Sequence, residues 1–151
     1  MPQLSAETLS GKEVSLPGAT AGRIAVFCVG FSHDSQSQVK HWRERIEKQF
    51  VDNPQIGVYS IAVLEDAPKV VRGMIVHAMK SGVPIERRDR FLILYHNERQ
   101  LKQATGFERS DAAYLLLIDQ RGDIRWRYHR KPSDAAEADL GKQIRRLLEA
   151  H

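Results

Sequence analysis

The chain has 151 residues, of which 42% are hydrophobic, and it carries a formal net charge of +4 at pH 7 with a pI near 9.4. This length and composition are those of one soluble globular domain, which we expect to span residues 1–151. The excess of positive charge is small and mixed with acids, as in Glu86–Arg90, which argues against nucleic-acid binding. The longest apolar run, Ile24–Phe31, is too short to cross a bilayer, and the N-terminal residues lack the apolar segment of a signal peptide. We therefore expect a soluble chain, cytoplasmic or peripheral to a membrane, and not an integral membrane protein.

The first half of the chain predicts strands followed by a helix. Thr8–Leu16 has the pattern of a short strand, a turn and a second strand. Ile24–Phe31 is a continuous β-rich apolar run, which is typical of a central strand covered on both faces. A helix follows, capped by Ser35 or Ser37. Its apolar positions recur at helical spacing: Val39, Trp42, Ile46 and Phe50.

A second strand and helix come next. Gly57–Leu64 predicts the strand, Pro68 lies in the first turn of the helix, and Ser81-Gly82 ends it. We expect this helix to bury one apolar stripe, which consists of Val70, Val71, Met74, Ile75 and Ala78.

The second half adds three strands and two helices. Strands are predicted at Phe91–Tyr95, Tyr114–Asp119 and Asp123–Tyr128, the last two as an antiparallel hairpin. Asn97–Thr105 is a short polar helix closed by Gly106. Ser133 and Asp134 cap a final helix whose apolar side is Leu140, Ile144, Leu147 and Leu148.

This order of elements predicts an α/β fold with a central mixed β-sheet and helices on both faces. The order is that of the thioredoxin-like fold. The extra strand and short helix in Phe91–Phe107 resemble the insertion of its peroxiredoxin and TlpA-like branches.

The strand–helix junction lacks the chemistry that redox members of this fold carry there. A thioredoxin-type site needs a thiolate at a helix N-terminus, where backbone N–H groups and the helix dipole lower its pKa. Here the turn reads Ser32-His33-Asp34-Ser35, and the matching positions, Ser32 and Ser35, are hydroxyls. A Ser-His-Asp hydrolase site is not indicated, because triad residues converge from separate elements, and Asp34 and the serines are better explained as helix caps.

Two further redox features are missing. The substrate-clamping cis-proline of redox members would fall near Ala112-Ala113, and alanine strongly disfavours a cis peptide. Cys28 is the one cysteine, so no intramolecular disulfide can form. It lies in the middle of the predicted central strand, where we expect it to be buried. We therefore predict no thiol–disulfide or peroxidase activity.

Metal binding is also not indicated. Copper sites on this fold use two thiolates, which are absent, and the six histidines show no close metal-ligand spacing. His33 and His96 are the pair that the fold could bring near each other. We expect no metal and no cofactor.

Three stretches, Val26–Trp42, Ser60–Pro84 and Ala113–Leu140, resemble the mitochondrial ATP-synthase assembly factor family, a thiol-free branch of the superfamily. The third stretch is the most specific, and its matching positions are Tyr114, Asp119, Ile124-Arg125-Trp126 and Glu137. The resemblance implies a protein that is not an enzyme and that helps to assemble the membrane sector (Fo) of ATP synthase.

Three functions remain open at this point. The first is a non-catalytic protein-binding domain whose partner is another protein, such as a subunit of a membrane complex. The second is a degenerate peroxiredoxin or thiol reductase that uses Cys28. The third is a binder of a small molecule or anion at the N-terminus of the first helix. For a partner surface we expect these residues: Ser32, His33, Asp34, Ser35, Ala112, Ala113, Arg125 and Trp126.

Overall fold

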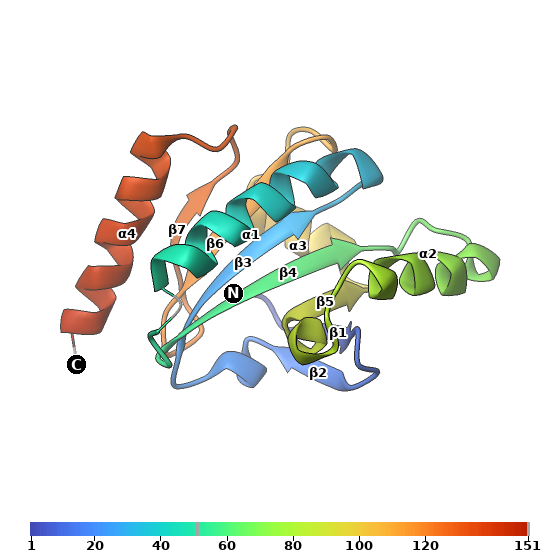
Figure 1. Ribbon diagram of the computed structural model, residues 1–151, viewed down its shortest axis with the longest axis horizontal. Coiled ribbons are helices and arrows are strands. Elements are labelled where there is room, and N and C mark those ends of the chain that lie inside the picture. The colour runs from blue at the N-terminus through green and yellow to red at the C-terminus, as the bar shows by residue number, and fades with distance from the viewer. Residues whose placement is uncertain (51, 151) are drawn as a thin grey trace.

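The computed structural model describes residues 1–50 and 52–150, which form a seven-stranded sheet and four α-helices (Figure 1). The strands are β1 Leu4–Thr8, β2 Glu13–Leu16, β3 Ile24–Gly30, β4 Ile56–Val63, β5 Phe91–Leu94, β6 Ala113–Ile118 and β7 Ile124–Tyr128. The helices are α1 Gln36–Phe50, α2 Lys69–Ser81, α3 Glu98–Thr105 and α4 Asp134–Glu149. Short 3-10 turns occupy Gly18–Thr20, His33–Ser35 and Ile85–Arg90.

The sheet is mixed, with strand order β2-β1-β5-β4-β3-β6-β7. β3 lies inside it, parallel to β4 and antiparallel to β6, and Val26 is in register with Val58 on one side and Leu117 on the other. All seven residues of β3 are buried, as the continuous apolar run requires. The predicted α/β thioredoxin-like architecture is therefore confirmed, and the five strands predicted from Ile24 onward match the observed ones to within one residue at each end.

The N-terminal hairpin is longer than predicted. β1 begins at Leu4, whereas the prediction started at Thr8. The side chains of Leu4, Ala6 and Thr8 are all buried. This alternation is the strand signal that the prediction missed.

The path of the chain decides which face each helix covers. The units β3-α1-β4 and β4-α2-β5 step across the sheet in the same direction, so right-handed crossovers place α1 and α2 on one face. Trp42 of α1 and Leu140 of α4 share a core cluster with Cys28, whereas Leu101 of α3 packs in the cluster of Phe27 on the opposite face. Figure 1 shows α1 and α4 side by side over β3, β6 and β7, with α3 behind the sheet.

The predicted burial of α2 was wrong. No residue of this helix is buried, and Val70 and Met74 are 87% and 72% exposed. Val76 and Met79 are partly buried against Phe91 and its neighbours. The helix lies at the margin of the molecule, beyond the end of β4 (Figure 1), so the sheet covers only part of its surface.

The helix ends follow the local signals with small shifts. α3 begins at Glu98 and is closed by Gly106 in the left-handed conformation, with φ 69°. Ser133 caps α4 by accepting a hydrogen bond from the Ala136 N–H, and Asp134 is the first residue of that helix. Within the described residues, no helix has both the length and the apolar character of a membrane span.

The exposure of α2 generates a stability prediction. We expect Met74→Ala to change the free energy of unfolding by less than about 0.5 kcal/mol, because this side chain packs against little. The control Ile46→Ala removes a fully buried side chain of α1 and should cost about 2–5 kcal/mol. Urea unfolding followed by circular dichroism measures both changes. A loss above about 2 kcal/mol for Met74→Ala would mean that this stripe is buried after all.

Candidate functional site

A glycine sets the geometry where β3 runs into α1. A Cβ atom at Gly30 would lie 2.6 Å from Ser35 Oγ, 2.8 Å from Gln36 Nε2 and 3.1 Å from Val39 Cγ2. A larger residue would force the side chains of Ser35 and Gln36 to shift, and the Ser35 hydroxyl is held by its own hydrogen bonds. The strand end and the helix start are therefore pressed together at this point.

The turn Ser32–Ser35 is a closed network of hydrogen bonds. The Ser32 N–H donates to Ser35 Oγ at 3.4 Å, and the Ser35 hydroxyl donates to the Ser32 carbonyl at 2.7 Å. Ser35 is fully buried, while the Ser32 hydroxyl donates to the carbonyl of Ser110. The two hydroxyls that stand at the redox-cysteine positions thus have structural partners, and the capped segment starts at Ser32 rather than at Ser35 or Ser37.

The loop before β6 lies beside this turn. The Tyr114 hydroxyl accepts hydrogen bonds from the N–H groups of Glu108 and Arg109, at 2.7 and 2.8 Å, and donates to the Arg109 carbonyl at 3.0 Å. Ala112 is half-buried and Ala113 is fully buried. In the described residues the cis peptide bond is Leu16-Pro17, so the Ala112-Ala113 bond is trans.

The structure brings some of the predicted site residues together and leaves others apart. Ser32, Ser35 and the Ala112 loop meet, although the buried Ala113 side chain cannot touch a partner. Arg125 and Trp126 lie elsewhere. Trp126 is in register with Leu117, which pairs with Val26, so it sits about 20 Å along the sheet from Ser32.

Both of these hairpin residues have partners within the chain. Arg125 pairs with Asp119 at 3.7 Å, and the Trp126 indole N–H donates to Asp139 Oδ2 of α4 at 2.9 Å. These contacts attach the hairpin to its own turn and to α4.

Cys28 is buried, as expected. Burial raises the pKa of its thiol from 9.0 to about 12, and the nearby positive charge of Arg43 offsets this only in part. The reactive species in thiol chemistry is the thiolate. At pH 7 this thiol is therefore protonated and shielded from solvent.

A groove that sequence reasoning missed opens beside the Ser32 turn. It has a volume of about 540 Å³ and lies between α2, the end of β4 and the start of α1. We call it the α2 groove. Its polar lining comes from Ser32, His33, Gln36, Asp66 and Glu98, and its apolar lining from Phe31, Ala62, Val63, Leu64, Ala67, Ile75 and Met79. The signal for it was present in α2, whose apolar residues form a side of the helix that is broader than a single stripe.

Carboxyl groups gather at one end of the α2 groove. Glu98 is only 8% exposed, and its carboxylate pairs with Lys102 Nζ at 3.6 Å. Burial, joined by the charges of Asp66 and Glu65, raises the pKa of the Glu98 carboxyl, and Lys102 offsets this in part. The Glu65 carboxylate accepts a hydrogen bond from the Glu98 N–H at 3.1 Å and so caps α3.

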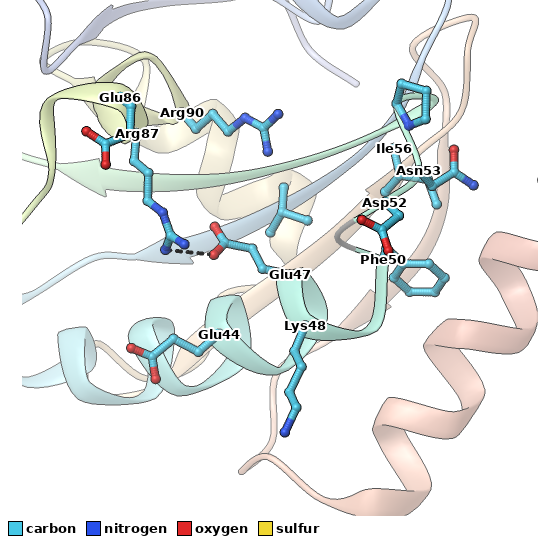
Figure 2. Close-up of a pocket in the computed structure, with 12 residues that line it drawn as sticks. Glu44, Glu47, Lys48, Phe50, Asp52, Asn53, Ile56, Glu86, Arg87 and Arg90 are labelled. Atoms are coloured by element: carbon cyan, nitrogen blue, oxygen red, sulfur yellow. Dashed lines mark hydrogen bonds and ion pairs between the residues drawn. The ribbon is translucent and has the colours of Figure 1, made fainter.

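A second cavity of about 610 Å³ lies at the other end of α1, and its polar lining carries both signs of charge (Figure 2). Figure 2 shows Arg87 directed at Glu47, to which it donates a hydrogen bond of 3.1 Å. Glu44, Glu86 and Arg90 lie around this pair. This balance of charge indicates no preference for an anion or a cation.

In the part of the chain that the structure describes, no group of three or more His, Cys, Asp or Glu side chains is arranged to hold a metal ion. This site offers helix caps, a groove and one buried carboxyl group, that of Glu98.

The fold and this junction define a thioredoxin-like domain in which serines occupy the positions of the thiol pair. Solved structures agree on the fold: a putative thiol:disulfide interchange protein DsbE from Chlorobium tepidum has TM-score 0.62 and 19% identity over 97% of this chain and 94% of that one. The lipoprotein thioredoxin Etrx1 from Streptococcus pneumoniae has TM-score 0.65 and 12% identity over 94% and 99%. BsSco, from the Sco family of cytochrome c oxidase assembly proteins, has TM-score 0.61 and 14% identity over 94% and 91%.

Within this class the chain belongs to the ATP10 protein family, whose members are ATP synthase assembly factors, and the family model matches residues 1–147. This confirms the resemblance drawn from the three sequence stretches. A search of curated protein sequences found no match.

Gly30 generates the first prediction from the site. We expect Gly30→Ala to cost about 1–3 kcal/mol of unfolding free energy, because the new methyl group overpacks the start of α1. The matched control is Gly73→Ala in α2, where a Cβ atom would meet nothing within 4 Å. This control should stabilise the protein by about 0.5–1 kcal/mol through the higher helix propensity of alanine. Equal effects in the two variants, measured by denaturant unfolding, would contradict the close approach at Gly30.

Glu98 generates a prediction of pH dependence. Its pKa is raised above the ordinary value of 4.5 in the folded state, so the folded chain binds more protons than the unfolded chain as pH rises from there through the raised pKa. This group therefore makes the wild-type protein less stable as pH increases across that window. We expect Glu98→Gln to unfold at a higher temperature than wild type at pH 7, and the difference to disappear below about pH 4.

The control for this experiment is Glu44→Gln, which alters an exposed carboxylate of α1 whose ion pair with Lys40 is long, at 4.0 Å. It should leave the melting temperature nearly unchanged at both pH values. If Glu98→Gln were no more stable than wild type at pH 7, the buried carboxylate would not destabilise the folded protein.

Proposed function

We propose that this chain is a non-catalytic, protein-binding thioredoxin-like domain that assists the assembly of a membrane complex such as ATP synthase. The observation that carries the proposal is the α2 groove beside the Ser32 turn. In redox relatives an extended substrate segment binds at this rim. Here serines replace both thiols, while a groove of about 540 Å³ remains, a volume typical of binding sites.

The enzyme alternative finds little support. A peroxidase or thiol reductase that used Cys28 would need an accessible thiolate. Cys28 is fully buried in β3, and its pKa is near 12. Reaction at this sulfur would require the helices packed over it to move away from the sheet.

The anion-binding alternative is opposed by charge. The N-terminus of α1 favours an anion through its free N–H groups. The groove in front of it, however, is lined by the carboxyl groups of Asp66 and Glu98, which repel a bound carboxylate or phosphate. A protein segment that presents apolar side chains fits this lining better.

Complementation in cells tests the proposed function. In a strain that lacks this gene, we expect less fully assembled ATP synthase on native gels, and wild-type protein should restore it. Cys28→Ser should also restore it, because the thiol has no chemical role. Ile75→Gln should fail, because Ile75 lines the α2 groove and a polar side chain there weakens apolar binding.

The matched control is Met74→Gln, which makes the same kind of change at the neighbouring residue, outside the groove and 72% exposed. It should restore assembly like wild type. Circular dichroism checks that each variant folds. Full rescue by Ile75→Gln, or loss of rescue with Cys28→Ser, would overturn the proposed function.

A further inference from the structure

The apolar part of the α2 groove is not filled by any segment of the described chain. Ile75 and Met79 form one wall, and Val63 and Leu64 at the end of β4 lie opposite. No residue of α2 is buried within the described chain. The apolar residues of α2 cover a broad side of the helix, and such a side is normally packed against another element. Part of this wall is therefore available to a partner.

The negative charge at the acidic end of the groove has few positively charged side chains beside it. Asp66 and Glu98 line the groove together, and Lys102 is the cation that pairs with Glu98. Arg72, the arginine of α2, donates instead to the backbone carbonyls of Ala67 and Glu65 and lies over the ring of Tyr95. Its guanidinium is therefore held by carbonyl groups and not by these two carboxyls.

The three carboxyl groups near this end have different roles. Glu65 has a structural role, since it caps α3. Asp66 is exposed and lines the groove, and its charge acts on the Glu98 carboxyl. Glu98 is 92% removed from solvent and keeps a carboxyl in a setting that disfavours the charged form.

We propose that the groove binds an apolar segment of the partner protein that carries one lysine or arginine, and that this cation lies between Asp66 and Glu98. The inference rests on the proposed function and names the chemistry of its partner. An arginine forms paired charge-assisted hydrogen bonds with carboxylates, and the apolar residues beside it fill the space along Ile75, Met79 and Val63. An acidic segment is excluded by like-charge repulsion, so charge selects the partner as well as strengthening binding.

Selection from a phage-displayed library of random 12-residue peptides tests this chemistry on the full chain. Peptides enriched on the wild-type protein should combine apolar residues with a single Lys or Arg. Replacement of that basic residue by Gln in the synthetic peptide should weaken binding about tenfold by isothermal titration calorimetry, as loss of a charged hydrogen bond predicts. The double variant Asp66→Asn, Glu98→Gln should show the same loss and should no longer distinguish the two peptides.

The control is Glu13→Gln, which removes an exposed carboxylate of β2 that does not line the groove. It should bind the enriched peptides like wild type. Acidic or uncharged consensus peptides, an unchanged affinity after the Gln replacement, or no enrichment would overturn the inference. So would a dimer seen by light scattering that Ile75→Gln dissociates, because a second copy would then occupy the groove.

The result also separates the two proposals. Peptides that shift the NMR signals of Ile75 and Val63 without any preference for a basic residue would sink the charge inference and leave the proposed function intact. If the cellular test failed but the preference for basic peptides persisted, the proposed function would be wrong and the charge preference of the groove would stand.

Discussion

The close contact between the end of β3 and the start of α1 is the constraint on which the rest of the site depends. Gly30 lets the Ser35 hydroxyl lie directly against the strand, and Ser35 in turn holds the Ser32 carbonyl. This fixes the direction in which α1 leaves the sheet. The position of the Ser32 turn at the mouth of the α2 groove follows from it, as does the burial of Cys28 beneath α1.

A second anchor holds the opposite side of the turn. The Tyr114 hydroxyl uses three hydrogen bonds to fix the backbone at Glu108 and Arg109. Its ring lies 5.6 Å from that of Phe31, the residue just before Ser32. The loop and the turn are therefore coupled through this aromatic contact and through the hydrogen bond from Ser32 to Ser110, and the rim is open toward α2.

Much of the fold could be predicted from the sequence because β3, β4, β5 and β6 are continuous runs of mostly buried apolar residues. The helices α1 and α4 were predictable because their apolar residues recur at helical spacing on one face, as Trp42 and Ile46 do in α1. The pattern in α2 was misread, since periodicity tells which residues are apolar and does not tell what covers them. Which residues of α2 are covered depends on where β4 ends relative to the helix, and this is a property of the tertiary structure.

The sequence predicted only those parts of the site whose residues are neighbours along the chain. The Ser32–Ser35 turn follows from the strand–helix junction, and its lack of thiols is a matter of composition. Asp66 and Glu98 come together because the chain passes through α2 and β5 between them. Their separation in the sequence gives no indication that they are close in space. Arg125 and Trp126 illustrate the opposite error: they stand out in the sequence, but the register of the β6–β7 hairpin carries them to the far end of the sheet.

The absence of any buried residue in α2 has a consequence for how this protein can evolve. Substitutions in a buried helix are limited by packing, and each costs stability. Ile75, Met79 and their neighbours are free of most of that penalty, although they form a wall of the groove. The groove residues can therefore change together with the sequence of a partner. The residues of β3 and α1, and Gly30 at their junction, cannot change as freely because folding depends on their packing.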